Sequence, residues 1–373
     1  MSNIDTESNT LECKIYDNTD ENMKKLADKV LDGELVIFPT ETVYGIGANI
    51  FNEKAINDIF AIKNRPKNNP LIVHCLGYYD SKSLTNLNEM DDYWFKLLAD
   101  NFWPGPLTIV VKASKIVASN VNCNNGYVGL RSPKHNAIRS IIQYAQTPIA
   151  APSANISGKV SSTCLDHVKK YFESCKINII NDNDYISEFG IESTVVKLEN
   201  SELSILRQGF ITEYDIKLFY NKYCKSHYLK ILHKTNVTDN ISPGQLKSHY
   251  CPNKPLYILN LISYPDDTEF QKNKEEICSV TNNYLKNSIL IDFNSICFEY
   301  KDKFLGYVDL SSNGDFKEAM FNLYNVFHQL NDINCDKILI YNFGNIENIY
   351  TESIWDKITR ASINNIYIPI NFF

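Results

Sequence analysis

The sequence predicts an α/β protein with two domains, each built on a β-sheet with flanking helices. Short apolar runs of strand length, such as residues 35–38 and 107–111, are interspersed with segments whose apolar residues recur at helical spacing, such as residues 21–31. Strands and helices do not alternate strictly over the first 210 or so residues, which favours a mixed twisted sheet there. The length of 373 residues is typical of two domains.

The first half has recognisable helix and strand signals in a clear order. Gly33 follows the first helical segment as a C-terminal cap, and Pro104-Gly105-Pro106 ends an aromatic-rich one. Helices are predicted at residues 21–31, 53–63, 91–102 and 135–146, with another starting near Ser162 or Thr163. Strands are predicted at residues 35–38, 71–73, 107–111, 127–130, 149–150, 176–180, 193–198 and 202–206, and residues 39–48 are expected to form a loop.

The helix and strand signals become weaker between residues 213 and 254. This stretch is polar and ends in SPGQLKSHYCPNKP. This stretch is too long for a plain connection inside one domain and is interpreted as a linker or lid. A second series follows, with strands predicted at 256–259, 288–293, 304–309 and 337–342 and helices at 268–285, 315–330 and 350–360. Its alternation predicts a small parallel sheet. The expected boundaries are 13–212 for the first domain, 213–254 for the linker or lid and 255–373 for the second domain.

The composition narrows the class of protein. The formal net charge is −7, and no block of like charges suggests a surface that follows a nucleic-acid backbone. None of the ten cysteines fits a C-x-x-C spacing, so a structural zinc site is not expected. The first residues show no signal or transit peptide, and no apolar run reaches the ~18 residues of a membrane span. A cytoplasmic location without membrane contact is expected.

Several common catalytic templates are missing from the sequence. It contains no G-x-x-x-x-G-K-[ST] loop, no complete G-x-G-x-x-G, no G-x-S-x-G and no H-E-x-x-H. Loops rich in Pro, Gly, hydroxyl residues and cations remain, at the ends of strands in the first half. Such loops are where sites on α/β sheets are built.

The most basic of these loops is KNRPKNNPLIVH at residues 63–74. Lys63, Arg65 and Lys67 fall within five residues, and two prolines stiffen the backbone. Fixed cations of this kind suit a polyphosphate ligand. Taken alone, the segment fits a solvated basic turn equally well.

Four further segments carry polar groups at strand ends. PTETVYGIGA at 39–48 offers hydroxyls, flexible glycines and Glu41, which would coordinate a metal or face water. APSANISGKVSST at 151–163 is dense in Ser and Asn and precedes a helix whose N-terminus could face an anion. Arg131, and Ser193 with the later Arg207, occupy other strand ends. Individually, each segment is as readily explained by ordinary turns, helix caps or surface arginines.

Together, these segments resemble the threonylcarbamoyl-AMP synthase family, whose catalytic domain has the YrdC-like fold. The resemblance rests on FPTETVYGIGA, KNRPKNNPLIVH, FWPGPLT, APSANISG and ESTVV, in the family's order, and on Lys63-x-Arg65 followed by Ser153-x-Asn155. It covers residues from about 13 to 212. SPGQLKSHYCP at 242–252 is similar to the linker of the longer members, which implies a Rossmann-like second domain at 255–373.

The resemblance implies a reaction and its substrates. L-threonine, bicarbonate or CO2, and ATP would give threonylcarbamoyl-AMP and pyrophosphate. A separate threonylcarbamoyl transferase would use the product to modify adenosine 37 of tRNAs that read codons starting with A. Mg²⁺ would be bound through the ATP phosphates, with no metal ligand from the protein, since the sequence shows no carboxylate cage. Direct contact with tRNA is left open.

The resemblance also implies roles for individual residues where the motifs match. The catalytic set would be Lys63, Arg65, Ser153 and Asn155. Threonine would be bound by Thr42, His74, Arg131, Ala151 and Ser193, and ATP by Arg65, Asn69, Ser153, Ser161 and Arg207. His249 and Tyr250 would belong to the lid. This sequence departs from the family pattern at Asn64, at Tyr127, at Ser161-Ser162-Thr163 and, in the linker, at Gln245 and Leu246.

Two rival functions are considered. Carbamoyl-transfer maturation factors embed a similar domain, but in longer chains with paired C-x-x-C zinc motifs, which this sequence lacks. A non-catalytic RNA-binding module would need a concave basic surface. The acidic balance of the chain and its set of cations and hydroxyls favour small-molecule substrates instead.

Overall fold

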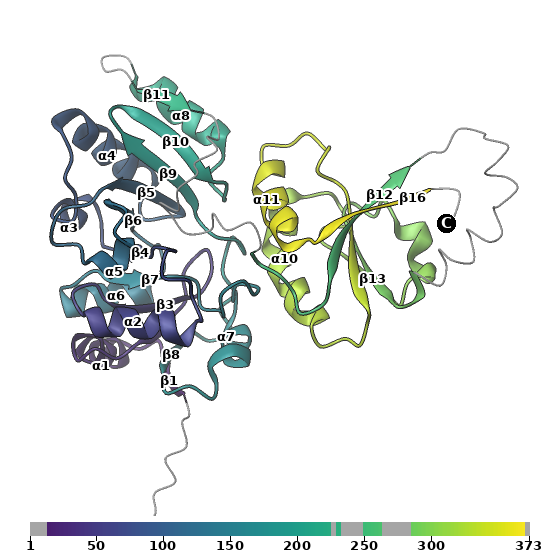
Figure 1. Cartoon of the computed structure of the whole chain (residues 1–373), viewed down its shortest axis with the longest axis horizontal. Helices are drawn as coiled ribbons and strands as arrows, with labels where there is room; N and C mark the ends of the chain where they lie inside the picture. Colours follow the sequence, from purple (N-terminus) through teal and green to yellow (C-terminus); the bar gives the residue numbers. More distant parts are fainter. Residues whose placement is uncertain (1–12, 225–228, 233–248, 263–284, 370–373) are drawn as a thin grey trace, which may run out of the picture.

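The computed structural model describes residues 13–224, 229–232, 249–262 and 285–369. Figure 1 shows two lobes, one holding the N-terminal two thirds of the chain and the other holding the rest. The first contains a large mixed sheet and the second a smaller parallel sheet. The predicted α/β fold class is therefore confirmed.

The first sheet has eleven strands among the described residues, in the order β1-β8-β2-β3-β7-β4-β6-β5-β9-β10-β11. Parallel and antiparallel pairs both occur, as in β4 with β6 and β5 with β6. The strands are β1 (Lys14–Asp17), β2 (Val36–Phe38), β3 (Gly45–Asn49), β4 (Ile72–His74), β5 (Leu107–Lys112), β6 (Tyr127–Arg131), β7 (Ile149–Ala151), β8 (Asn178–Asn181), β9 (Thr194–Glu199), β10 (Glu202–Arg207) and β11 (Lys230–Leu232).

Helices of the first lobe cover this sheet. They are α1 (Asp20–Leu31), α2 (Glu53–Ile62), α3 (Tyr78–Lys82), α4 (Glu89–Phe102), α5 (Ser119–Asn122), α6 (Asn136–Ala145), α7 (Leu165–Phe172) and α8 (Glu213–Tyr223). Local signals explain several starts: the side chains of Thr19, Asn52 and Asn88 cap α1, α2 and α4. One apolar cluster joins α2 and α4 to the sheet, and another joins α1 and α6 to it.

Strand β3 lies inside the segment that was predicted to be a loop. It pairs antiparallel with β2 and continues to β7. Glycine permits this close pairing, because a Cβ on Gly47 would lie 2.5 Å from an Ile149 methyl and 2.7 Å from the Phe38 ring. Gly47 thus serves strand packing rather than the approach of a ligand.

The first domain extends beyond the boundary expected at residue 212. Thr212 and Asp215 form a capping box that starts α8, whose buried Ile216 and Phe219 join the main core. Strand β11 then pairs in parallel with β10. Residues 213–223 and 230–232, which were expected to belong to a linker, therefore supply a helix and an edge strand of the first domain.

The second sheet is parallel throughout its described strands, in the order β14-β13-β15-β12-β16. Its elements are β12 (Leu256–Ile262), β13 (Ser288–Asp292), the 3-10 helix η1 (Phe298–Lys303), β14 (Gly306–Asp309), α10 (Phe316–Leu330), β15 (Lys337–Tyr341), α11 (Thr351–Ala361) and β16 (Asn364–Pro369). The final strand was not predicted. The helix predicted at 268–285 and residues 242–248 of the linker motif lie almost wholly outside the described residues.

Helices α10 and α11 lie on the side of the second sheet that faces the first domain (Figure 1). The apolar core beneath them includes Val43, Val160 and Ile191 of the first domain, together with Tyr250. The two domains therefore share one continuous apolar cluster. No helix among the described residues is long and apolar enough to cross a membrane.

A pair of stacked histidines lies in this interface. The rings of His167 on α7 and His328 on α10 are 3.8 Å apart between centroids and 12° from parallel. The His328 Nε2 group donates to the backbone oxygen of Ser161 over 3.1 Å. Burial lowers the pKa of His167 to about 3 and that of His328 to about 4. Both rings are therefore neutral at pH 7.

We expect the free energy of unfolding of His328→Gln to fall less steeply than that of wild type as the pH is lowered. The folded-state pKa of His328 lies below the ordinary value near 6.5, so the unfolded chain binds more protons between about pH 4 and 6.5. Stability should fall as the pH is lowered through that window, by up to about 1.4 kcal/mol per pH unit for one such group. Urea unfolding at pH 7, 6 and 5 measures the slope. Equal slopes in wild type and variant would contradict this assignment.

Candidate active site

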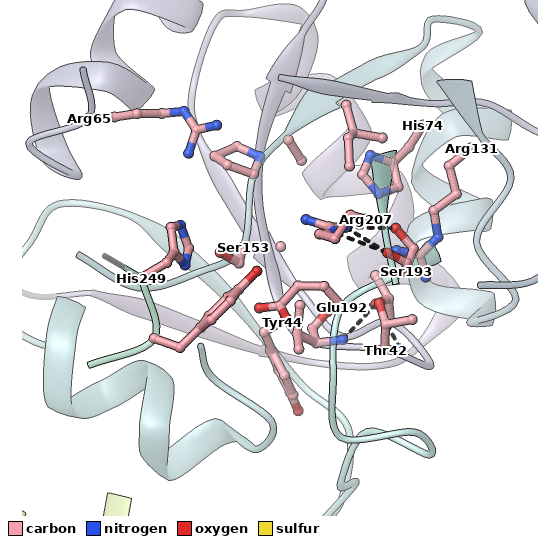
Figure 2. Close-up of a pocket in the computed structure, with 17 residues that line it drawn as sticks. Thr42, Tyr44, Arg65, His74, Arg131, Ser153, Glu192, Ser193, Arg207 and His249 are labelled. Atoms are coloured by element: carbon pink, nitrogen blue, oxygen red, sulfur yellow. Dashed lines mark hydrogen bonds between the residues drawn. The ribbon is translucent and has the colours of Figure 1, made fainter. Parts of the chain in front are cut away.

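One cavity gathers the strand-end loops of the first domain and the start of the second. Seventeen residues line it: Thr40 and the segments 42–45, 151–153, 192–193 and 249–250, together with Arg65 in the loop after α2 and four residues on other strands, Ile72, His74, Arg131 and Arg207. Figure 2 shows His74, Arg131, Ser193 and Thr42 toward one side, and Arg65, Ser153 and His249 toward the other, with Arg207 between them.

Arg65 is held rigidly before any ligand binds. Helix α2 ends at Ile62, and Asn64 adopts φ of 50°, which turns the chain so that the Arg65 amide bonds to the Phe60 carbonyl. The Arg65 guanidinium donates to the backbone oxygen of Asn69 at 2.9 Å, to the Asn69 Oδ1 at 2.7 Å and to the Pro70 oxygen at 2.8 Å. Burial lowers the pKa of Arg65 to about 10, so the group stays charged at neutral pH.

Lys63 does not line the cavity. Its Nζ donates to the backbone oxygens of Ser153, at 2.6 Å, and of Asn155. The side chain is fully buried, and burial, followed by the charge of Arg65, holds its pKa well below the usual range. In this structure Lys63 therefore supports the 153–155 loop from behind.

The same loop is fixed from within. The Ser153 Oγ donates to the Asn155 Oδ1 over 2.6 Å. The Asn155 Nδ2 donates to the backbone oxygens of Ile156 and Lys159. Ser153 faces the cavity, whereas Asn155 stands one layer behind it. Lys63 thus contacts the loop that carries Ser153 and Asn155, while Arg65 and Ser153 line the cavity.

Arg131 is the last residue of β6 and forms a buried ion pair with Glu41. Its Nη2 donates to the Glu41 Oε1 over 2.7 Å, and the backbone amide of Lys134 donates to the other carboxylate oxygen over 2.9 Å. The side chains of Arg131 and Glu41 are only 5% and 2% exposed. The expectation that Glu41 coordinates a metal or faces water is therefore wrong: it neutralises and orients Arg131.

Thr42 and His74 lie beside Arg131. The Thr42 hydroxyl lies 3.0 Å from that of Thr40, which in turn donates to the Val43 carbonyl. Burial, followed by the charge of Arg131, lowers the pKa of His74 to about 3, so the ring is neutral at pH 7. The His74 Nδ1 is buried with no hydrogen-bond partner among the described residues. His74 itself lines the cavity.

Ser193 and Arg207 come together from β9 and β10. The Arg207 Nε and Nη2 donate to the Ser193 carbonyl at 3.1 and 2.9 Å, and Nη2 also reaches the Ser193 Oγ at 3.1 Å. The Ser193 hydroxyl lies 2.8 Å from that of Thr108. The guanidinium is thus held by both the backbone carbonyl and the hydroxyl of Ser193.

His249 and Tyr250 form the wall contributed by the chain that enters the second domain. Tyr250 adopts φ of 65° and packs on Tyr324, with ring centroids 5.5 Å apart. The His249 Nδ1 and the Tyr250 Oη are buried without a partner in the described part of the chain. Burial, followed by the charges of Arg65 and Arg207, lowers the pKa of His249 to about 3. Both side chains therefore meet the cavity as neutral hydrogen-bonding groups.

Glu192 lines the cavity and was not singled out from the sequence. Among the described lining residues it is the only one that carries a carboxylate. Its oxygens accept hydrogen bonds from the hydroxyls of Ser161 and Tyr324. The ESTVV motif contains this residue, but nothing in the sequence indicated a hydroxyl donor from the second domain.

The structure brings most of the expected residues to one place. Those that line the cavity are Thr42, Arg65, His74, Arg131, Ala151, Ser153, Ser193, Arg207, His249 and Tyr250. Those that do not are Lys63, Asn69, Asn155 and Ser161, and each contacts a lining residue. The expected residues thus form a lining and a layer of supports behind it.

We expect Glu41→Gln to destabilise the fold strongly. The variant leaves the buried Arg131 charge without its counter-charge, a change that typically costs about 3–5 kcal/mol. Glu188→Gln is the matched control, because the Lys134–Glu188 pair is 56% and 47% exposed and such pairs contribute about 0–1 kcal/mol. Urea denaturation compares the two. Similar losses in both variants would refute the role given to Glu41.

Comparison with known protein families divides the chain between residues 209 and 211, ahead of α8 and β11, which belong to the first domain in the structure. A family model described as "Telomere recombination", named for Sua5, YciO and YrdC, matches residues 28–209. A second, described as "Threonylcarbamoyl-AMP synthase, C-terminal domain", matches residues 211–362. The two models together cover most of the chain.

Curated relatives of this chain are named threonylcarbamoyl-AMP synthase. The threonylcarbamoyl-AMP synthases of Pyrococcus abyssi and Bacillus subtilis are each 36% identical to this chain, over 62% and 64% of its length. The aligned parts span about two thirds of those relatives, 65% and 67%. A putative threonylcarbamoyl-AMP synthase from Methanocaldococcus jannaschii is 32% identical over 53% of this chain and 92% of the relative.

The whole architecture also has a solved counterpart. The crystal structure of P. abyssi Sua5 complexed with L-threonine superposes with a TM-score of 0.78 at 28% identity, covering 95% of this chain and 99% of that one. Sequence similarity and three-dimensional similarity thus agree over both domains. The chain belongs to the threonylcarbamoyl-AMP synthase family.

Proposed function

We propose that this protein condenses L-threonine, bicarbonate or CO2, and ATP to threonylcarbamoyl-AMP and pyrophosphate. The observation that carries the proposal is the cavity itself, which Arg65, Arg131 and Arg207 line together with neutral hydrogen-bonding side chains. Charged, oriented groups of this kind suit an amino-acid carboxylate and a polyphosphate. The solved relative named for its complex with L-threonine supports the amino-acid substrate.

The two sides of the cavity suggest two subsites (Figure 2). Thr42, His74, Arg131, Ala151 and Ser193 would receive threonine, with the Arg131 guanidinium facing its carboxylate. Arg65, Ser153 and Arg207 would contact ATP. Asn69 and Ser161 would act on the nucleotide side only through Arg65 and Glu192, the residues they contact here.

The proposed chemistry has two steps. The neutral threonine amine attacks the carbon of CO2, which forms an N–C bond and, after loss of one proton, a carbamate. A carbamate oxygen then attacks the α-phosphate, and the bond to pyrophosphate breaks. Such transfers depend on alignment and on neutralising phosphate charge more than on a strong base. Guanidinium groups already fixed by carbonyl oxygens supply that charge without reorganisation.

Lys63 and Asn155 fit this scheme as supports. Both hold the loop that presents Ser153, through the Lys63 Nζ bonds to two carbonyls and the Asn155 side-chain amide. Loss of either would displace Ser153 rather than remove a ligand contact. The catalytic set Lys63, Arg65, Ser153 and Asn155 would thus act as one unit with two members in contact with substrate.

Mg²⁺ is proposed to enter with ATP. Glu192, the sole carboxylate-bearing residue among the described residues of the lining, already accepts two hydroxyl bonds, so the donor set suits a metal carried by phosphate oxygens. The ion would help neutralise the phosphates. The protein's own contribution is to hold the phosphate chain against Arg65 and Arg207.

The product would serve a transferase that modifies adenosine 37 of tRNA, and both proteins would work in the cytoplasm. Threonylcarbamoyl-AMP is a mixed anhydride between a carbamate and a phosphate, so it needs an acceptor soon after release. This placement rests on the family membership. Direct binding of tRNA by this chain is not part of the proposal.

Pyrophosphate release is the direct test of the proposed reaction. Purified protein with ATP, L-threonine, bicarbonate and Mg²⁺ should release pyrophosphate, and omission of threonine or bicarbonate should stop it. Serine and valine serve as controls for the amino-acid subsite. A folded protein that released no threonine-dependent pyrophosphate would rule out the synthase function.

We expect Arg65→Ala to lower the turnover rate at least a hundredfold while leaving the fold intact. The variant removes a preorganised charge proposed to contact the phosphates, an effect typically worth a few kcal/mol in the transition state. Lys67→Ala is the control, since it removes a cation from the same loop that lies outside the cavity lining. Near-normal turnover in Arg65→Ala would exclude Arg65 from the site.

A further inference from the structure

The second domain contacts the wall of the cavity at two places. The wall segment 190–193 carries Glu192 and Ser193, and the segment 207–209 begins with Arg207. Both segments lie in the first domain, and both receive hydrogen bonds from helices of the second. Two segments that carry cavity-lining residues are thus held by hydrogen bonds from outside their own domain.

Helix α10 holds the first segment through Tyr324. This side chain is fully buried, and its Oη donates to the Glu192 Oε2 over 2.8 Å. The other carboxylate oxygen accepts from the Ser161 Oγ, and the backbone oxygen of Ser161 is itself bonded by His328 of the same helix. One helix therefore fixes both oxygens of Glu192, one directly and one through Ser161.

Helix α11 holds the second segment. The Lys357 Nζ donates to the Gln208 carbonyl over 2.7 Å, and the Ser353 Oγ donates to the Gly209 carbonyl over 2.7 Å. These carbonyls follow Arg207 directly in the chain. The backbone is tightly enclosed here, since a Cβ on Gly209 would lie 2.3 Å from the Thr194 amide nitrogen. A shift of this segment would therefore move Arg207.

Burying these polar side chains in the domain interface costs more free energy than burying apolar ones would. Lys357 is a charged side chain with no exposure, and burial holds its pKa below the usual range. Burying a charge or a phenol hydroxyl is unfavourable unless each is hydrogen-bonded, and apolar residues of similar size would bury the interface at lower cost. The Lys357 charge is offset by Asp356 of its own helix, whose Oδ2 accepts from Nζ over 3.0 Å. Across the interface, Tyr324 and Lys357 donate to Glu192 and to the carbonyl that follows Arg207, which indicates positioning of these two lining residues.

We propose that Tyr324 and Lys357 are positioning residues through which the second domain holds Glu192 and Arg207 in the geometry needed for catalysis. The inference rests on the proposed synthase activity and extends it to residues outside the catalytic domain. Neither residue lines the cavity, so each acts through the wall segment it contacts. The pocket is complete only when the two domains are docked.

Tyr324→Phe tests the first contact, because it removes one oxygen and keeps the ring that packs on Tyr250. We expect kcat for threonine-dependent pyrophosphate release to fall about tenfold or more, the size expected for a hydrogen bond to a charged group. The loss should persist at saturating substrate, because misalignment remains in the bound complex. Lys357→Met tests the second contact in the same way.

Asp332→Asn is the matched control. It breaks the Lys170–Asp332 ion pair, which joins the same two domains just beyond the end of α10 but is 44% and 67% exposed. This variant should leave kcat unchanged. A purely structural role for Tyr324 would lower the melting temperature but would leave kcat per folded molecule equal to that of wild type.

Hydrogen–deuterium exchange gives a readout that does not need activity. Amides of residues 190–194 and 207–209 should exchange faster in Tyr324→Phe and Lys357→Met than in wild type and Asp332→Asn. Unchanged exchange and kcat in Tyr324→Phe would overturn the proposal, as would an equal loss of kcat in Asp332→Asn. Faster exchange with an inactive wild type would reject the synthase function and leave the positioning supported. If Lys357→Met is insoluble, Tyr324→Phe decides alone.

Discussion

Three buried guanidinium groups share one cavity, and the rest of the structure is arranged to hold them there. Arg65, Arg131 and Arg207 repel one another, and burial favours neither their charges nor their proximity. Arg131 is offset by the buried carboxylate of Glu41, whereas Arg65 is fixed by the carbonyls and side-chain amide of its own loop, and Arg207 by the Ser193 carbonyl. The described lining holds three guanidinium groups and one carboxylate, that of Glu192, so an anionic substrate would relieve the repulsion among the three cations.

The charge states of the two cavity histidines depend on burial and on these three arginines. His74 and His249 lie close to arginines and are neutral, so they add hydrogen-bonding atoms without adding charge. Lys63, although fully buried, turns away and holds the loop that presents Ser153. The second domain also supports the cavity through buried hydrogen-bond donors. Its buried Tyr324 and Lys357 complete the hydrogen bonds of wall segments that the first domain cannot satisfy alone, so the domain interface and the active site form one polar network.

The sequence predicted the framework well where signals are local. Periodic apolar residues and caps located helices such as α1 and α4 to within two residues, and strand-end loops located most of the lining. Strand β3 was missed because its glycines, which suggest a loop, are required by close packing on Phe38. Helix α8 was missed because its apolar residues do not form one clear stripe: Ile216 and Phe219 are buried, whereas Tyr214 and Leu218 are exposed. Glu41 and Glu192 were misjudged or overlooked because their partners, Arg131 and Tyr324, are 90 and 132 residues away in the chain.

We propose that one cavity joins an amino acid, one carbon atom and a nucleotide. Mass spectrometry of the reaction product, formed from ATP, L-threonine and ¹³C-bicarbonate, tests this most directly. We expect a single adduct that contains threonine, AMP and one ¹³C atom, which appears together with pyrophosphate and disappears when Arg65 is replaced by alanine. Pyrophosphate release that gave only an unlabelled threonyl adenylate, or AMP with no threonine attached, would contradict it.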